Sequence, residues 1–134
     1  MGYTGDVVTV DTVGAVTGNK DLCTASDFIA VNAHPFFNGA IQPSDSGDFL
    51  KSQIESIQST CGTDKSIMIT ETGWPTQGSN DGTCVPSKEN QLTAIKSIIE
   101  AGLGDQVFMF TTYNDPWKEA GAYGVEQYWG IYSS

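Results

Sequence analysis

Four short apolar runs, each ending in polar and aromatic residues, constrain the fold of this chain more than any other feature. They fall within residues 6–13, 27–37, 66–75 and 106–117. Each begins as a near-continuous stretch of β-branched or aromatic residues rather than a strict alternation, which is typical of strands buried on both faces of a parallel sheet. The runs therefore predict four parallel strands, each followed by a loop.

Helical patterns separate these runs. Residues 43–62 predict a helix that ends at Gly62, and residues 85–104 predict one that begins at Ser87 and ends at Gly102. Residues 13–26 predict only a short helix, and residues 124–134 a turn or two. The apolar faces of the two longer helices would be Phe49, Leu50, Ile54 and Ile57 in the first, and Leu92, Ile95, Ile98 and Ile99 in the second.

Strands that alternate with helices predict an α/β fold with parallel crossovers. Two architectures fit this order: a small open sheet with helices, or a (β/α)4 half of an eight-stranded TIM (β/α)8 barrel. The 134 residues, 39% of them hydrophobic, suffice for a single unit over residues 1–134. In either architecture, polar residues just past the C-terminal ends of the strands form the functional edge.

Glu71 is the main candidate on that edge, because it directly follows the apolar run Ile-Met-Ile-Thr. A carboxylate held rigidly and partly desolvated at the mouth of a buried strand suits a nucleophile or a general acid. Gly73 would let the backbone turn sharply, and Pro75 would stiffen the exit. Trp74 has two interpretations, as a flat face for a sugar ring or as a structural plug.

Amide, aromatic and charged residues at the other strand ends indicate a carbohydrate-binding rim. Amides bind hydroxyl groups, aromatic rings pack on sugar faces, and a lysine beside an aspartate favours the ionised carboxylate. A hydrogen-bonded structural role for the histidine stays open. The candidates are Asn32, His34 and Phe37 after the second run, and Tyr113, Asp115, Trp117 and Lys118 after the fourth.

Charge and composition limit the partners. A net charge of -10 makes nucleic acid and anionic membranes poor partners, whereas a neutral sugar is compatible. The sequence has no run of 18 apolar residues, no metal-ligand spacing and no glycine-rich phosphate loop. We therefore predict no membrane span, metal, cofactor or nucleotide site. The first residues also lack the pattern of a signal peptide.

Three cysteines, Cys23, Cys61 and Cys84, match no zinc module in their spacing. Two interpretations stay open. Either one disulfide forms and leaves one thiol free, or all three cysteines are buried and reduced.

The segment "ITETGWPTQGS" resembles the nucleophile segment of glycoside hydrolase family 17, which comprises β-1,3-glucanases and β-1,3-glucanosyltransferases. "TVDTVGAV", "SDFIAVNAHPFFNG" and "MFTTYNDPWK" resemble its fungal cell-wall branch, so the resemblance covers essentially the whole chain. It implies a (β/α) barrel, a β-1,3-glucan substrate, chemistry that retains anomeric configuration, and secretion to the cell wall.

The resemblance also implies roles for single residues. Glu71 matches the nucleophile, while Asp115 and Lys118 match an Asn-Glu-x-x-Lys pattern in which aspartate here replaces glutamate. The positions that match cleft contacts are Asn32, His34, Phe37, Trp74 and Trp117.

One departure from the family pattern limits these implications. Retaining chemistry needs a second carboxylate, which the family carries in an Asn-Glu motif that this sequence lacks. The chain resembles the C-terminal half of the barrel, strands five to eight. We therefore expect association, as a homo-oligomer or with a complementary N-terminal half. The alternative is a non-catalytic half-barrel module that binds glucan or assembles.

Overall fold

A computed structural model describes residues 2–132 and contains one four-stranded sheet. The strands are β1 (Val10–Thr12), β2 (Ile29–Asn32), β3 (Ile67–Thr72) and β4 (Val107–Met109), in that spatial order. Each strand pairs in parallel with the next, so that Asp11 lies opposite Val31 and Ile69 opposite Val107. The predicted parallel α/β half-barrel is therefore confirmed.

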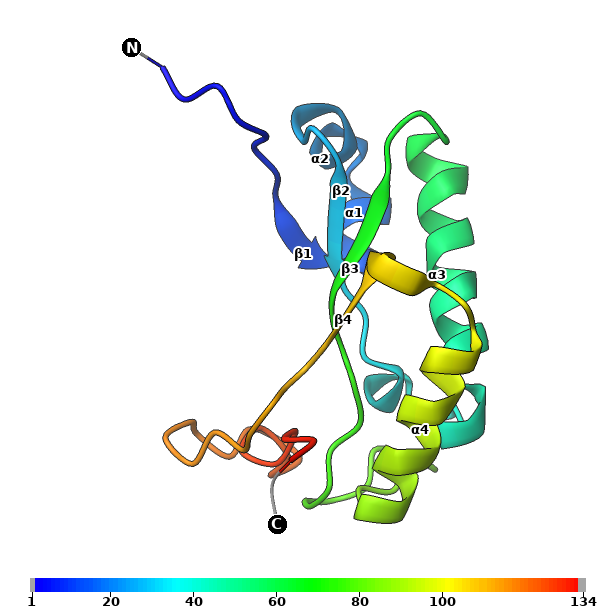
Figure 1. Ribbon diagram of the computed structural model, residues 1–134, viewed down its shortest axis with the longest axis vertical. Coiled ribbons are helices and arrows are strands. Elements are labelled where there is room, and N and C mark those ends of the chain that lie inside the picture. The colour runs from blue at the N-terminus through cyan, green and yellow to red at the C-terminus, as the bar shows by residue number, and fades with distance from the viewer. Residues whose placement is uncertain (1, 133–134) are drawn as a thin grey trace.

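Helices fill the connections between the strands, and Figure 1 shows α3 and α4 along one side of the sheet. The first connection, predicted to hold one short helix, holds two. The helices are α1 (Val13–Gly18), α2 (Lys20–Ala25), α3 (Ser46–Cys61) and α4 (Lys88–Glu100). The 3-10 turns are η1 (Pro35–Asn38), η2 (Pro43–Asp45) and η3 (Gly104–Gln106). Among residues 2–132 no helix has the length and apolarity to cross a membrane.

The predicted helix ends are largely confirmed. Ser87 caps α4, since its Oγ accepts a hydrogen bond from the Asn90 backbone N–H at 3.0 Å. Gly62 ends α3 with a φ of 86°, a conformation that favours glycine.

The predicted apolar face of α4 is partly wrong. Ile98 is buried, but Leu92 and Ile99 are each 70% exposed. The buried stripe runs instead through Gln91, Ala94 and Ile98. Ala94 packs in a second cluster of buried side chains, and Gln91 on the same face of the helix donates to backbone carbonyls there.

The main core lies between the sheet and its helices. Val31 of β2 and Ile69 of β3 pack there with Leu50 and Ile57 of α3, all of them fully buried. Each such side chain contributes about 1.5–3 kcal/mol through removal from water. This core holds the C-terminal ends of β2 and β3 side by side.

The edge strands are shorter than predicted and poorly covered. β1 is exposed along its whole length, and β4 ends at Met109, although its apolar run continues to Phe110. Val10 is 51% exposed and Phe108 is 55% exposed. Each edge strand has a neighbour on one side only, so both borders of the sheet present unpaired backbone groups.

Cys23 and Cys61 form a disulfide that joins α2 to the end of α3. Cys84 is a free, buried thiol. Of the two interpretations of the cysteines, the first is therefore correct.

A second core lies beyond the C-terminal ends of the strands. It is built by η1, the loop after β3, α4 and the segment 110–132, and its members are Phe36, Trp74, Cys84, Ala94, Val125 and Trp129. Gln91 of α4 connects its parts, because its Nε2 donates to the carbonyl oxygens of Trp74 (2.9 Å) and Trp129 (3.3 Å). The segment 110–132, which contains no helix or strand, is thereby fixed beside the sheet.

Candidate active site

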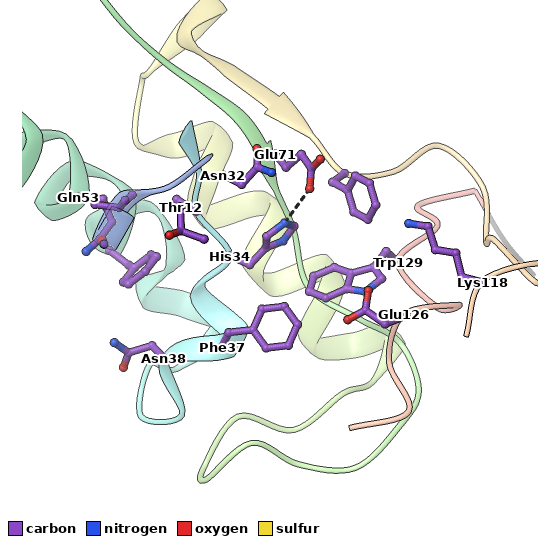
Figure 2. A pocket seen from close by; sticks show the side chains of 15 residues that line it. Thr12, Asn32, His34, Phe37, Asn38, Gln53, Glu71, Lys118, Glu126 and Trp129 are labelled. Atoms are coloured by element: carbon purple, nitrogen blue, oxygen red, sulfur yellow. Dashed lines mark hydrogen bonds and ion pairs between the residues drawn. The ribbon is translucent and has the colours of Figure 1, made fainter. Parts of the chain in front are cut away.

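A cleft of about 560 Å³ lies at the C-terminal ends of the strands, above the second core. Figure 2 shows the side chains that line it, which come from β1, β2, β3, α1, η1, α3, the loop after β2 and the segment 110–132. The three residues predicted for the end of the second strand meet here around Glu71. They are Asn32, His34 and Phe37.

Glu71 projects into this cleft from the end of β3. Its backbone is held in the sheet, where its carbonyl oxygen accepts a hydrogen bond from the Ala33 N–H at 2.9 Å. Its side chain is 38% exposed, and Oε2 lies 3.3 Å from His34 Nε2 (Figure 2). The carboxylate is thus accessible to a ligand and anchored at its base, as a nucleophile requires.

His34 is enclosed by aromatic rings and is only 12% exposed. The ring centroids of Trp129, Phe110 and Phe37 lie 4.7, 5.7 and 6.0 Å from its own. Burial lowers the pKa of His34 below 6.5, and the neighbouring Glu71 opposes this effect only in part. His34 is therefore neutral at pH 7.

The contact with Glu71 fixes the tautomer of this neutral histidine. An ionised carboxylate only accepts hydrogen bonds, so Nε2 carries the hydrogen and donates it. Nδ1 is then an acceptor, and among residues 2–132 it is buried without a partner. His34 thus holds the Glu71 carboxylate in a fixed orientation.

Asn32 presents its amide to the cleft beside Glu71 (Figure 2). Its Oδ1 lies 2.8 Å from the Thr70 hydroxyl, which donates to it. With the oxygen engaged in this way, the NH₂ group is oriented to donate to a ligand.

The predicted residues of the fourth strand end divide into two sets. Lys118 lines the cleft, with its Nζ 3.3 Å from Asp115 Oδ2 and 4.5 Å from the Phe110 ring centroid. Asp115 is half-buried and pairs with Lys118 from outside the cleft. Tyr113 and Trp117 are 66% and 78% exposed and also lie outside it.

Trp74 does not have the sugar-stacking surface that the resemblance implied. It is fully buried in the second core, and its Nε1 donates to the Val85 carbonyl oxygen at 3.0 Å. A stacked sugar needs an exposed ring face, so the structural interpretation of Trp74 holds. Gly73 does not have a positive φ. A Cβ at this position would meet the Phe110 carbonyl oxygen, so the close approach of that oxygen to the Gly73 backbone explains the glycine.

Several cleft residues were not predicted from the sequence. Trp129 and Glu126 lie in "EQYW", which has no strand or helix periodicity and belongs to residues 124–134, where the sequence predicts only a turn or two. Phe110 follows β4 but stood inside an apolar run, where it was assigned to the strand. Gln53 and Phe49 belong to α3, where Phe49 was assigned to the core. The clustering of aromatic residues between positions 123 and 132 was the available signal.

The cleft combines a partly exposed carboxylate with an amide donor, a lysine and aromatic walls. Among the described residues, no three His, Cys, Asp or Glu side chains gather where they could hold a metal. The groups present suit a direct attack by a carboxylate on a neutral, hydroxyl-rich substrate, with aromatic rings against its apolar faces.

Comparison with known proteins places these residues in a family. Residues 1–130 match the BtgE/BtgC glycoside hydrolase domain. The chain is 50% identical over 133 residues to cell surface mannoprotein MP65 of Candida albicans and 51% identical to the probable family 17 glucosidase SCW10 of Saccharomyces cerevisiae. Both alignments include 99% of this chain, but only 35% and 34% of the length of the two relatives.

Solved structures agree on the fold. A glycoside hydrolase family 17 β-1,3-glucanosyltransferase from Rhizomucor miehei superposes with a TM-score of 0.80 at 24% identity, over 96% of this chain and 46% of that one. An active-site mutant of the Rhizomucor enzyme in complex with laminaritriose superposes equally well. The resemblance to family 17 is thereby confirmed, and the chain belongs to the BtgE/BtgC glycoside hydrolase family.

Proposed function

We propose that this chain supplies, as a single unit, the nucleophile-bearing half of a retaining β-1,3-glucan hydrolase or transglycosylase. The observation that carries the proposal is the position of Glu71, anchored at the end of β3, 3.3 Å from His34 and open to the cleft. In this role a Glu71 carboxylate oxygen bonds to the anomeric carbon while the glycosidic C–O bond breaks, and the departing oxygen takes a proton from the second carboxyl group. Water or a sugar hydroxyl, deprotonated by the same group, then displaces Glu71 from the glycosyl-enzyme intermediate.

The chemistry of the cleft supports a glucan substrate. Asn32 and Lys118 supply donors to hydroxyl oxygens, while Phe37 and Phe110 offer rings to the faces of a sugar. The laminaritriose complex of the Rhizomucor enzyme gives a β-1,3-linked precedent on the same fold. Tyr113 and Trp117 are exposed outside the cleft, so we propose that they contact only those parts of a substrate that extend beyond it. Trp74 is buried and is not among the proposed contacts.

The half-barrel needs a partner for full chemistry. A retaining mechanism requires a second carboxylate about 5 Å from the nucleophile. Glu126 lines the cleft, yet no Asn-Glu motif is present in the sequence. We propose that a complementary N-terminal half supplies the acid and base group and covers the open borders at β1 and β4.

The same open borders favour a second candidate function. A half-barrel without the second carboxylate can act as a non-catalytic module that binds β-1,3-glucan or assembles with itself. A cell-surface or cell-wall location suits both candidates, because the Candida relative is a cell surface mannoprotein and the Cys23–Cys61 disulfide suits an oxidising compartment.

Turnover of laminari-oligosaccharides distinguishes the two candidates. The isolated chain should bind them with little hydrolysis, and addition of an N-terminal half should restore turnover that Glu71→Gln abolishes. Glu126→Gln tests whether the other carboxylate of the cleft contributes to turnover. Turnover that is unchanged in Glu71→Gln would exclude Glu71 as the nucleophile. Binding without turnover, even with the N-terminal half present, would favour the module.

A further inference from the structure

A tight turn behind the cleft joins two of its walls, η1 and the segment 110–132. The turn comprises residues 79–85 of the loop after β3, and within it the backbone groups of Asp81 and Cys84 exchange two hydrogen bonds, of 2.8 and 3.1 Å. We name these residues the Asp81 turn. The structure describes all of them, and none lines the cleft. Any effect of the turn on a ligand is therefore indirect.

Backbone hydrogen bonds hold the Asp81 turn between the two walls. On one side, the Thr83 N–H donates to the Gly39 carbonyl oxygen at the end of η1, at 2.8 Å. On the other side, the Ser79 N–H donates to the Tyr123 carbonyl oxygen at 2.7 Å. The turn therefore connects two segments that lie far apart in the sequence, and it fixes where the side chain of Asp81 begins.

The side chain of Asp81 contacts the same two segments. Its Oδ1 accepts a hydrogen bond from the Tyr123 hydroxyl at 3.1 Å. A Cβ at Gly39 would lie 3.2 Å from the same oxygen, so Asp81 also lies against the end of η1. The hydrogen bond to Asp81 raises the pKa of the Tyr123 hydroxyl above its ordinary value. Asp81 and Tyr123 are both half-buried, which limits the access of competing water to this hydrogen bond.

The ring of Tyr123 supports Phe37, the aromatic residue of η1 that lines the cleft. The ring centroids of Tyr123 and Phe37 lie 6.2 Å apart, and Phe36 lies at the same distance from Tyr123. Phe37 in turn contacts His34 and Trp129, with centroid distances of 6.0 and 5.6 Å, and Figure 2 shows its ring beside that of Trp129. Because Phe37 is 43% exposed, it depends on these ring contacts for a fixed orientation.

We propose that Asp81 is a positioning residue of the cleft. Its hydrogen bond to the Tyr123 hydroxyl holds the Tyr123 ring against Phe37, and Phe37 forms the aromatic wall beside His34. The inference rests on the proposed function and adds to it, because it places a determinant of glucan affinity outside the cleft. Asp81 itself contacts no substrate and acts through Tyr123.

Calorimetric titration of the 134-residue chain with laminaritriose tests this role. Loss of one hydrogen bond weakens an interaction about three- to tenfold, and Asp81→Ala and Tyr123→Phe should each weaken binding within this range. Asp81→Asn should keep the original affinity, because its amide oxygen still accepts the hydrogen of the Tyr123 hydroxyl. The double variant of Asp81→Ala and Tyr123→Phe should bind no more weakly than either single variant, because both remove the same hydrogen bond.

The matched control is Tyr3→Phe, the same substitution at a tyrosine that is 79% exposed and lies outside the cleft. It should leave the affinity for laminaritriose unchanged. Tyr123→Phe keeps the aromatic ring, so it decides the question even where Asp81→Ala does not fold.

Nuclear magnetic resonance provides a measurement that a general loss of stability would not reproduce. Tyr123→Phe should shift the ring signals of Phe37 and the indole signal of Trp129, and it should leave the indole signal of the exposed Trp117 in place. In Asp81→Ala the pKa of Tyr123 should fall toward its ordinary value, because the carboxylate that raises it is absent.

The outcomes separate this role from the proposed function. Affinity for laminaritriose that is unchanged in Asp81→Ala and Tyr123→Phe overturns the positioning role, while binding by the unsubstituted chain still supports the glucan site. Affinity that falls as far in Asp81→Asn as in Asp81→Ala overturns it too, because a hydrogen-bond acceptor is then not what matters. Phe37 signals that do not move in Tyr123→Phe have the same consequence. Absence of binding by the unsubstituted chain overturns both proposals.

Discussion

The Cys23–Cys61 disulfide should provide a large share of the stability of this chain. The bond closes a loop with a sequence separation of 38 residues and joins α2 to α3, which otherwise contact each other through few side chains of the main core. Chain-entropy arguments for a loop of this length give a stabilisation of about 4 kcal/mol at 25 °C. Domains of this size have a free energy of unfolding of about 5–15 kcal/mol, so reduction should remove a large fraction of it.

Urea unfolding with and without reductant measures this contribution. The midpoint of thermal unfolding should also fall by roughly 10–15 °C on reduction. A Cys23→Ala, Cys61→Ala double variant should start at the lower stability and be insensitive to reductant, which controls for other effects of the reagent. Thiol titration of the denatured, oxidised chain should find Cys84 alone. Three reactive thiols, or a loss below about 1 kcal/mol on reduction, would refute this reasoning.

Three further predictions concern the site and its support. The pKa of His34, the single histidine, should lie below 6.5. The free energy of unfolding should therefore fall as the pH decreases through 6.5, because the unfolded chain binds the proton more readily. In urea unfolding, His34→Gln should remove this pH dependence. Trp74→Ala should cost about 3–5 kcal/mol by the same assay, with Trp117→Ala near zero as its exposed control. Gly73→Ala should shift the backbone signals of Phe110 and weaken laminari-oligosaccharide binding, whereas Gly18→Ala, at an exposed position outside the cleft, should do neither.

The four strands and the position of Glu71 could be predicted because local sequence determines both. The mostly apolar run at residues 67–70 is long enough to identify a buried strand, and Glu71, which follows it directly, must then lie near the edge of the sheet. Trp129 and Glu126 could not be predicted in the same way. They reach the cleft only because a segment without regular structure packs against α4 and η1, and these contacts leave no periodic pattern in the sequence.

The two faces of α4 illustrate the same limit. Helical spacing correctly identified a helix, but Leu92 and Ile99 are as apolar as Ile98, so hydrophobicity alone could not select the buried stripe. The buried stripe includes Gln91, and this residue is polar. It is buried because the backbone carbonyls of Trp74 and Trp129 require a donor at that point.

In residues 71–75, the side chain that faces the cleft and the residues that fix its position follow one another directly. Glu71 faces the cleft, whereas Gly73 allows the Phe110 carbonyl to approach and Trp74 anchors the chain in the second core. A nucleophile functions only if its position is fixed to a fraction of an ångström, and a loop alone provides no such precision. The residues after Glu71 are therefore needed to hold it in place, although within this segment only Glu71 lines the cleft. For this reason substitutions at Gly73 and Trp74 should weaken the proposed turnover through loss of structure, while Glu71→Gln should abolish that turnover without loss of stability.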